Sequence, residues 1–504
     1  MSEPDTIMSG FKMNLLAKAT EIGTNGLLVL LLTRVYMSTG EYGLLNLALS
    51  IFGIAVFFSR MGFAKSAARY VTEYRETEPS KIPLIVGWSL ALNGFTIVLV
   101  SVALVVFRKP IIAQFGEPEL LPLFSLGVLF VVTRTIRAYA YFLCQGFNRV
   151  SWSAILSIVS NLSIFTFVLG FLESGFGIAG ALLGYVVGYA LGATLGLFVL
   201  YRLLLEIYPD EGLHADTEQT NTDAATDSSD KRLIRRILDY SIPLTITGAS
   251  SILYKRVDIV LIGAFASPIA VGYYVLAKQL TEFVAAPASS LGFAVAPTYG
   301  ESKSNDDLER AANIYETTFE HNLLFYIPAA AGIGLVADPA IRHVFGHDYL
   351  GAIPIVQVLS LFVVLESINK ITNGALDFLG RARHRAISKG GTAMLNVGLN
   401  IVLIPTIGAT GAAIATVISY VIMVIVNIYL INTELPLSLR GLFLTTCRVC
   451  SIAIGMSLIV VFTLPYVTDV LSLIAIVVLG TAVWLALAVT SGLLNLRWAI
   501  AQLS

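Results

Sequence analysis

The sequence predicts an all-α, polytopic membrane protein with about fourteen transmembrane helices, and three observations lead to this prediction. Of the 504 residues, 56% are hydrophobic and only 13% are charged, whereas a soluble domain usually carries about 25% charged residues. The mean hydropathy is +0.80. Apolar runs of about 20 residues, the length that crosses a bilayer, recur along the chain. The net charge of −1 gives no reason to expect a nucleic-acid partner.

The expected spans follow one another along most of the chain, separated by short connections. Segment 1–10 carries two acidic residues and lacks the basic region of a signal peptide, so we expect the first apolar run to be retained as a helix. The expected spans are 11–36, 42–60, 82–107, 119–145, 151–172, 176–201, 238–265, 269–299, 319–339, 350–379, 386–406, 410–431, 441–465 and 468–492.

Basic residues are distributed unevenly between the connections. Lys and Arg gather after the second, fourth, sixth and tenth spans, whereas the other connections carry few. Cytoplasmic connections are enriched in these residues, so the pattern predicts a multi-pass protein of the cell (plasma) membrane with both termini in the cytoplasm. The long hydrophilic stretch from Tyr208 to Asp230 is rich in Asp, Thr and Ala, and predicts a disordered cytoplasmic linker.

The two halves of the chain resemble each other, which predicts an internal repeat of six helices. At an offset of 229 residues, three residues of the first half have identical partners in the second: Ser38 with Ser267, Gly43 with Gly272 and Ala48 with Ala277. The segment Gly62–Ala64 matches Gly292–Ala294 at an offset of 230, and Gly177–Ala181 matches Gly408–Ala412 at 231. An even number of helices preserves orientation, so we expect two parallel six-helix lobes, which suit alternating access, plus two C-terminal helices. The expected parts are an N-terminal lobe at 1–207, a linker at 208–237, a C-terminal lobe at 238–432 and two additional transmembrane helices at 433–504.

Ionisable side chains occur within several expected spans, at helical spacing and in both halves of the chain. Such groups are costly in a bilayer and usually face a cavity or a partner, so they predict a shared hydrated cavity. The candidates for ion coupling or for lining this cavity are Lys18, Glu21, Asn25, Asp258, Glu282, Glu366, Lys370 and Asp377. A plainer interpretation stays open, because Lys278 with Glu282 and Glu366 with Lys370 are also spaced as self-neutralising i,i+4 pairs.

The candidates for substrate binding are the cations Arg134, Arg137, Lys255, Arg256 and Lys278. Arg134 and Arg137 have no acidic residue within a helical turn of the same span. A guanidinium group binds phosphate through two parallel hydrogen bonds, so these two arginines are the best candidates for holding an anionic group.

Patterns for cofactors and metals are weak. Cys447 and Cys450 form an isolated C-x-x-C, whereas a structural zinc site needs four ligands, and His343, His347 and Asp348 make a poor metal set. The P-loop pattern G-x-x-x-x-G-K-[ST] is missing, so we expect no ATP hydrolysis, no cofactor and no metal.

Two stretches identify a resemblance to a known family. The first is Asp258 to Phe265 followed by Val271 to Tyr274, and the second is Leu399 to Pro405 followed by Ile407 to Thr416. They resemble the polysaccharide-transporter branch of the multidrug/oligosaccharidyl-lipid/polysaccharide exporter superfamily, which contains O-antigen-type flippases. The resemblance extends over nearly the whole chain, and we interpret its motifs mainly as packing and turn features. It implies cationic cavity residues that hold a lipid phosphate, and an extra helix pair that hosts the lipid tail.

The function expected from this resemblance is a flippase, a transporter rather than an enzyme. It would move a polyprenyl- or dolichyl-phosphate-linked sugar or oligosaccharide across the membrane, for surface polysaccharide synthesis or protein glycosylation, in contact with membrane lipids and with H⁺ or Na⁺ as the coupling ion. One alternative is an ion-coupled multidrug or cation antiporter of the same superfamily, which should have a more acidic and aromatic cavity. Another is a membrane glycosyltransferase or polymerase, which the missing Asp-x-Asp pair and the lack of large loops disfavour.

Overall fold

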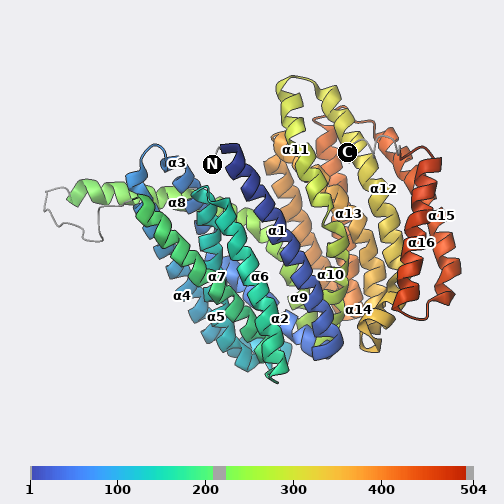
Figure 1. The fold of residues 1–504 in the computed structure, drawn as a ribbon, viewed down its shortest axis with the longest axis horizontal. Coiled ribbons are helices and arrows are strands. Elements are labelled where there is room, and N and C mark those ends of the chain that lie inside the picture. The colour runs from blue at the N-terminus through green and yellow to red at the C-terminus, as the bar shows by residue number, and fades with distance from the viewer. Residues whose placement is uncertain (1–2, 208–222, 495–504) are drawn as a thin grey trace. The chain divides into compact units, whose positions relative to one another are not determined.

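The computed structural model describes residues 3–207 and 223–494, and all regular structure within these ranges is helical (Figure 1). The first half of the predicted linker, 208–222, lies outside the described residues. The second half is helical, because α8 begins at Asp223, so the expectation of disorder was wrong for 223–230. Contacts divide the chain into two compact units. Unit 1 comprises residues 1–37 and 44–252, and unit 2 comprises 38–43 and 253–504. The division therefore lies inside the seventh expected span, not at the linker.

Unit 1 is built from long antiparallel helices. Its helices are α1 (Glu3–Leu31), continued by a π-helical turn (Leu32–Tyr36), most of α2 (Thr39–Arg60), α3 (Phe63–Tyr74), α4 (Ile82–Phe115), α5 (Leu120–Gly146), α6 (Val150–Glu173), α7 (Gly177–Ile207) and α8 (Asp223–Ile252). The most extensive helix packing in this unit joins α7 to α6 and to α5.

Unit 2 begins where a π-helical turn (Leu253–Val257) continues α8. Its helices are α9 (Asp258–Phe265), α10 (Pro268–Ala285), α11 (Ala288–Ser304), α12 (Leu308–Ala340), α13 (Ile353–Phe378), α14 (Ala382–Asn432), α15 (Leu439–Thr463) and α16 (Val470–Thr490). A π-helical turn (Ile341–Phe345) and a 3₁₀ segment (His347–Ala352) join α12 to α13.

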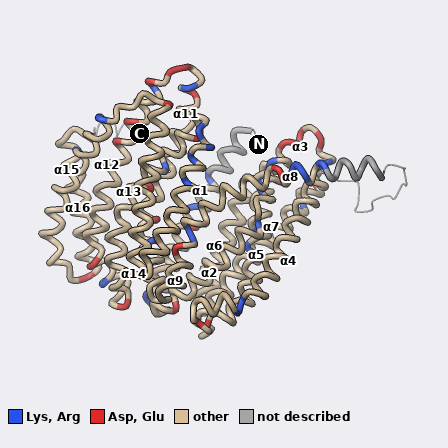
Figure 2. The backbone as a smooth tube through the Cα atoms, turned by 180° about the vertical axis from the view of Figure 1, so that it is seen from behind, with Lys and Arg blue, Asp and Glu red and all other residues tan. Residues whose placement is uncertain are grey.

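Eleven helices in the described ranges are long and apolar enough to cross a membrane, and they account for the expected spans as follows. The 51-residue helix α14 is two helices merged across a kink at Ile407 and Gly408; at about 1.5 Å per residue it is long enough for two crossings, as expected. The spans expected at 238–265 and 269–299 are interrupted and more polar, as α8–α9 and α10–α11. Figure 2 shows charged residues concentrated towards the helix ends, with long uncharged stretches between them.

Two connections were predicted wrongly. The basic segment after the second span contains the amphipathic helix α3, whose buried face includes Phe63, Ala67 and Val71. Arg108 and Lys109 directly follow the expected third span, 82–107, but lie inside α4, which continues to Phe115. Hydropathy alone misses both features because it responds to the apolar run and not to where the backbone stops being helical.

Two of the matched pairs have equivalent structural roles, whereas Gly62, with φ of +74° before α3, and Gly292, inside α11, do not. Ser38 and Ser267 cap α2 and α10, since their hydroxyl oxygens accept from the backbone N–H groups of Glu41 and Ala270, at 3.3 and 3.2 Å. Gly177 and Gly408 both adopt a left-handed backbone, with φ of +54° and +61°. A non-glycine residue is strained there, so both halves keep glycine at the start of their sixth helix.

Gly43 and Gly272 show the same equivalence through a reciprocal contact within unit 2. A Cβ on Gly43 would overlap the carbonyl oxygen of Pro268, and a Cβ on Gly272 would overlap that of Thr39. Pro268 follows Thr39 at the same offset of 229 that relates the two glycines. Backbone cannot move aside as a side chain can, so both positions require glycine.

A cluster of charged side chains outside the expected spans links the end of α11, the connection between α13 and α14, and the connection between α14 and α15 in unit 2. Glu434 accepts hydrogen bonds from Arg381 Nε at 2.7 Å and from Lys303 Nζ at 3.2 Å. Lys303 also donates to the Leu379 carbonyl at 2.6 Å. Burial alone would raise the pKa of Glu434, but the hydrogen bonds and charges of the two cations outweigh it and lower the pKa below its usual value.

We predict that Glu434→Gln destabilises the protein at neutral pH by about 1 kcal/mol, a value reduced by the solvent exposure of the two cations. A carboxylate with a lowered folded-state pKa stabilises above its unfolded value of about 4.3, and this stability is lost as the pH falls through the lower folded value. Thermal unfolding in detergent should therefore show a difference from the parent chain that is constant near pH 7 and disappears in acid. A difference that persists at acid pH, or an equal effect of Glu119→Gln at an exposed site, would contradict the ion-pair explanation.

Candidate functional site

Two arginines of α5 lie among aromatic rings in unit 1. The Arg134 guanidinium is 5.3 Å from the ring centroids of both Phe130 and Tyr189. The Arg137 guanidinium is 5.8 Å from the Tyr189 ring. Ring faces attract cations, so the rings stabilise these charges without neutralising them.

Arg137 is also held by two serines of α6. Its Nε donates to Ser160 Oγ at 2.9 Å, and its Nη2 donates to Ser157 Oγ at 3.1 Å. The Ser160 hydroxyl donates its own proton to the Leu156 carbonyl at 2.7 Å, so its oxygen is oriented to accept from Arg137. A guanidinium has five N–H donors, and these two bonds use two of them.

The charge balance around these arginines is positive. Among the described residues, no carboxylate lies within ion-pair distance of Arg134 or Arg137. Glu21 of α1 attracts Arg137 only at longer range, and Glu21 itself pairs with Lys18 at 2.9 Å in an exposed pair. Asn25 of α1, another candidate for ion coupling or for lining the cavity, is also exposed.

Sequence reasoning missed a third arginine of this cluster. Arg60, at the end of α2, is close enough to be repelled electrostatically by Arg134 and Arg137. Its guanidinium lies 5.7 Å from the Phe142 ring, and Lys65 Nζ lies 5.3 Å from the same ring. Arg60 is the last residue of the expected second span, a position that gives no sign of its proximity to α5.

In unit 2, a buried carboxylate is surrounded by hydrogen-bond donors. Asp258 is fully buried at the start of α9. It accepts from Tyr274 Oη at 2.8 Å and from Asn400 Nδ2 at 2.9 Å. Lys278 Nζ lies 3.5 Å from it and donates to the Tyr254 carbonyl at 2.8 Å. Lys278 therefore pairs with Asp258 and not with Glu282, the partner suggested by helical spacing.

This network changes the interpretation of the resemblance motifs, which we had taken mainly as packing and turn features. Asp258, Tyr274, Asn400 and Thr416 all belong to those motifs, and all four meet around the one carboxylate, with Thr416 Oγ1 at 3.5 Å. The sequence does carry one sign of this network, since Asn400 is a polar residue inside an apolar run and such a residue usually has a buried hydrogen-bond partner.

Other predicted residues form a second polar region of unit 2. Glu366 and Lys370 pair at 3.5 Å, as their spacing suggested, and Lys370 donates to Ser289 Oγ at 2.8 Å. Glu282 is exposed and acts on Glu366 only through its charge. The remaining predicted residues are placed as follows: Asp377 pairs with Arg385 at 2.8 Å, Lys255 is exposed and close enough to repel Lys389, and Arg256 is half-buried.

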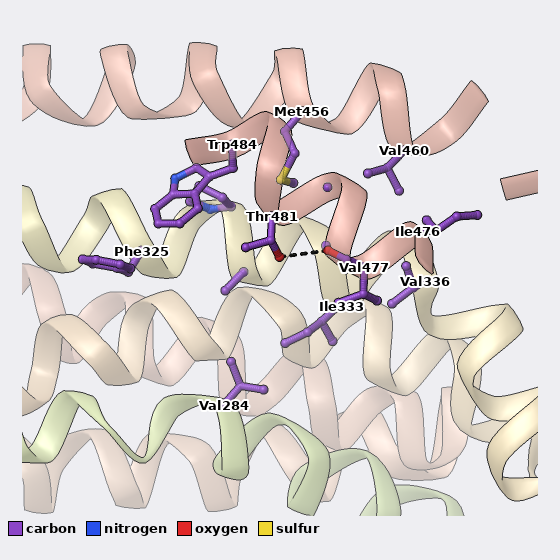
Figure 3. Close-up of a pocket in the computed structure, with 14 residues that line it drawn as sticks. Val284, Phe325, Ile333, Val336, Met456, Val460, Ile476, Val477, Thr481 and Trp484 are labelled. Atoms are coloured by element: carbon purple, nitrogen blue, oxygen red, sulfur yellow. Dashed lines mark hydrogen bonds between the residues drawn. The ribbon is translucent and has the colours of Figure 1, made fainter. Parts of the chain in front are cut away.

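An apolar cavity of about 400 Å³ lies in unit 2 among α10, α12, α15 and α16 (Figure 3). Its wall includes Phe325, Met456 and Trp484. The polar groups on this wall are already bonded, since the Thr481 hydroxyl donates to the Val477 carbonyl at 2.8 Å and the Trp484 indole N–H donates to the Leu324 carbonyl at 3.0 Å. The cavity therefore suits a purely apolar ligand group.

The eleven long apolar helices of the described residues, several of which carry ionisable side chains, are those of a multi-pass membrane protein. A family model described as polysaccharide biosynthesis protein matches residues 16–302, and the chain belongs to this family. A second model, MatE, matches residues 243–402. The predicted membership of the exporter superfamily is therefore confirmed.

Two curated archaeal proteins are similar to this chain. The probable low-salt glycan biosynthesis flippase Agl15 of Haloferax volcanii is 22% identical over 250 residues, which cover 50% of this chain and 53% of that protein. The match thus spans about half of the relative's length. An uncharacterised membrane protein of Methanocaldococcus jannaschii, MJ1068, is 25% identical over 409 residues, covering 78% of this chain and 77% of that protein.

The fold is that of a solved flippase. The structure of the lipid II flippase MurJ in an inward closed conformation aligns with a TM-score of 0.68 at 16% identity, covering 96% of this chain and 97% of that chain. The predicted all-α membrane fold is confirmed. Several of the relatives and structural neighbours are named as flippases or transporters, in agreement with the prediction of a transporter rather than an enzyme.

We predict that Lys278→Met destabilises the protein by about 3–5 kcal/mol, because it leaves the carboxylate of Asp258 buried and unpaired. The double variant Asp258→Asn with Lys278→Met should recover most of this loss, since no unpaired charge remains. Unfolding in detergent measures both variants. Lys18→Met, which breaks an exposed pair, is the control and should change stability by less than about 1 kcal/mol. Equal loss in the single and double variants would show that the charge pair does not govern stability.

Proposed function

We propose that this protein translocates a polyprenyl- or dolichyl-phosphate-linked sugar or oligosaccharide across the cell membrane by alternating access. The observation that carries the proposal is the arginine cluster of α5, in a chain that belongs to the polysaccharide biosynthesis family. The name of the Haloferax relative points to glycan synthesis as the process served.

The arginine cluster supports an anionic ligand on physical grounds. Arg60, Arg134 and Arg137 repel one another, and no described carboxylate pairs with them. Removing charges from water costs free energy, and an unneutralised group of cations is stabilised most by an anion that accepts several hydrogen bonds. A lipid phosphate provides both the charge and the acceptor oxygens.

The apolar cavity beside α15 and α16 in unit 2 has the wall that an isoprenoid chain requires. A lipid tail gains little free energy on moving from the bilayer into an apolar cavity, because the two environments are similarly apolar. The cavity would therefore discriminate between apolar chains mainly by shape.

Ion coupling is assigned to the Asp258 network. Asp258 accepts hydrogen bonds from Lys278, Tyr274 and Asn400, so gain or loss of H⁺ or Na⁺ at the carboxylate would alter contacts between α9, α10 and α14. Such a rearrangement is the kind of two-state change that transport requires.

The second candidate is a multidrug or cation antiporter, which the MatE match at 243–402 favours. Its cationic substrates would need acidic contacts. Unit 2 offers Glu282 and Glu366 for this purpose, but Glu366 already pairs with Lys370.

The function is tested by deleting the gene and profiling lipid-linked sugars and surface glycans by mass spectrometry. We expect a complete lipid-linked sugar to accumulate and the matching glycan to disappear. The parent gene should restore the glycan, whereas Arg134→Ala with Arg137→Ala should reduce it at least tenfold, the effect of losing about 1.4 kcal/mol of binding. Arg235→Ala, at an exposed arginine with an 84% accessible side chain, is the matched control.

Two results would contradict the flippase assignment. One is that both lipid-linked sugar and surface glycan stay unchanged in the deletion strain while sensitivity to cationic dyes rises, which would favour the antiporter. The other is full complementation by the double arginine variant at normal protein levels. A defect in the enzyme that transfers the sugar is excluded by measuring its activity in membranes of the same strain.

Filling the apolar cavity should impair transport without unfolding the protein. Gly332 lines the cavity, and a Cβ added there meets no atom within 4 Å. We expect Gly332→Leu to place its side chain in the cavity, to keep the parent unfolding temperature and to lower glycan export in the complementation assay. Gly170→Leu in α6 is the matched control, since its Cβ also meets open space. Normal export by Gly332→Leu would remove the cavity from the proposed pathway.

A further inference from the structure

Helix α7 packs against α6 through a row of glycines spaced four residues apart. The row consists of Gly180, Gly184, Gly188, Gly192 and Gly196. A Cβ on Gly184 or Gly188 would meet Val168 or Ile164 of α6, at backbone as well as side-chain atoms. Rows of small residues let helix backbones approach closely, so most of this pattern is explained by packing.

Gly192 differs from the other members of the row because its neighbours are polar. A Cβ on Gly192 would overlap Ser160 Oγ and would lie 3.2 Å from Arg137 Cγ. Ser160 Oγ is the atom that accepts the hydrogen bond from Arg137 Nε at 2.9 Å. The space left by the missing side chain of Gly192 is thus the space in which the serine hydroxyl meets the arginine.

The hydroxyl has little freedom to move elsewhere. It donates to the Leu156 carbonyl at 2.7 Å, and Ser160 is fully buried. A methyl group at position 192 would force the hydroxyl from this place, and the Nε of Arg137 would lose its acceptor. The remaining bond to Ser157 at 3.1 Å joins a different nitrogen, and one bond does not fix the plane of a guanidinium.

We infer that Gly192 is a positioning residue for Arg137: by leaving room for Ser160 between α6 and α7, it fixes the guanidinium with its free N–H groups available to the phosphate of the transported lipid. This inference rests on the proposed function. Phosphate recognition by arginine is bidentate and depends on the orientation of the plane, so a rotated Arg137 binds less tightly even though its charge is unchanged.

The test uses the purified full-length protein in detergent, with dolichyl phosphate and neutral dolichol as probes in titration calorimetry. We expect Gly192→Ala and Ser160→Ala each to weaken dolichyl phosphate binding about tenfold, as for the loss of a hydrogen bond to a charged group. The double variant should bind no more weakly than Gly192→Ala, because both changes remove the same contact. The affinity for dolichol should stay unchanged. A general packing defect would lower the affinities for dolichol and dolichyl phosphate together.

Gly188→Ala is the matched control one turn away. Its added methyl would lie 2.7 Å from the Ile164 backbone nitrogen, so it disturbs the same helix pair away from Arg137. We expect it to lower the unfolding temperature while leaving the ratio of dolichyl phosphate to dolichol affinity as in the parent chain. If Gly192→Ala does not fold, Ser160→Ala still reports on the contact, because it removes the hydroxyl without adding an atom.

The outcomes separate this inference from the proposed function. If the parent chain does not bind dolichyl phosphate, or binds it equally after Arg137→Ala, the proposed function fails and the inference fails with it. If Arg137→Ala abolishes binding while Gly192→Ala or Ser160→Ala binds as the parent does, only the positioning role is overturned. Full recovery of binding in the double variant would also overturn it, because the lost hydrogen bond would then not matter.

Discussion

A charge placed at membrane depth must be neutralised or stabilised locally, and this constraint accounts for most of the specific features of the chain. Unit 2 meets it by surrounding the carboxylate of Asp258 with Tyr274, Asn400 and Lys278. Unit 1 meets it differently, by placing Arg134 and Arg137 against aromatic rings and serine hydroxyls. In unit 2 the Lys278 ammonium and the Asp258 carboxylate neutralise each other. In unit 1 the contacts of Arg134 and Arg137 are uncharged, so their positive charge is not neutralised.

The backbone is shaped by a second constraint, close helix packing, which determines where glycine is required. Gly43 and Gly272 let two helix starts touch through their backbones. Gly177 and Gly408 allow a left-handed turn before the sixth helix of each half. These requirements explain why the repeat survives at glycine and serine positions while the apolar positions, which tolerate exchange between Leu, Ile and Val, have diverged.

The sequence predicts those parts of the fold that depend on local composition. Helix α5 was expected at 119–145 and is observed at Leu120–Gly146, because one apolar run with clear ends determines it. The absence of an acidic partner for Arg134 and Arg137 was also visible, since helical spacing is enough to exclude neighbours on the same helix. Contacts between helices were not predictable in this way. Lys278 stands four residues from Glu282 yet pairs with Asp258 on α9, and Arg60 joins the α5 arginines from the end of α2.

The two charge arrangements have different consequences for ligand binding. In unit 2 the carboxylate already has its partners, so an added ion must compete with Lys278 and its binding is tied to a rearrangement of helices. In unit 1 the arginines repel one another, so an anion relieves an unfavourable interaction that exists before it arrives. Binding there needs only that the guanidinium groups be held in place beforehand, since preorganised groups lose less freedom on binding. The serines of α6 and the glycine opposite Ser160 provide that restraint. Under the proposed function, the arginines of unit 1 hold the anionic substrate and the carboxylate network of unit 2 responds to an ion.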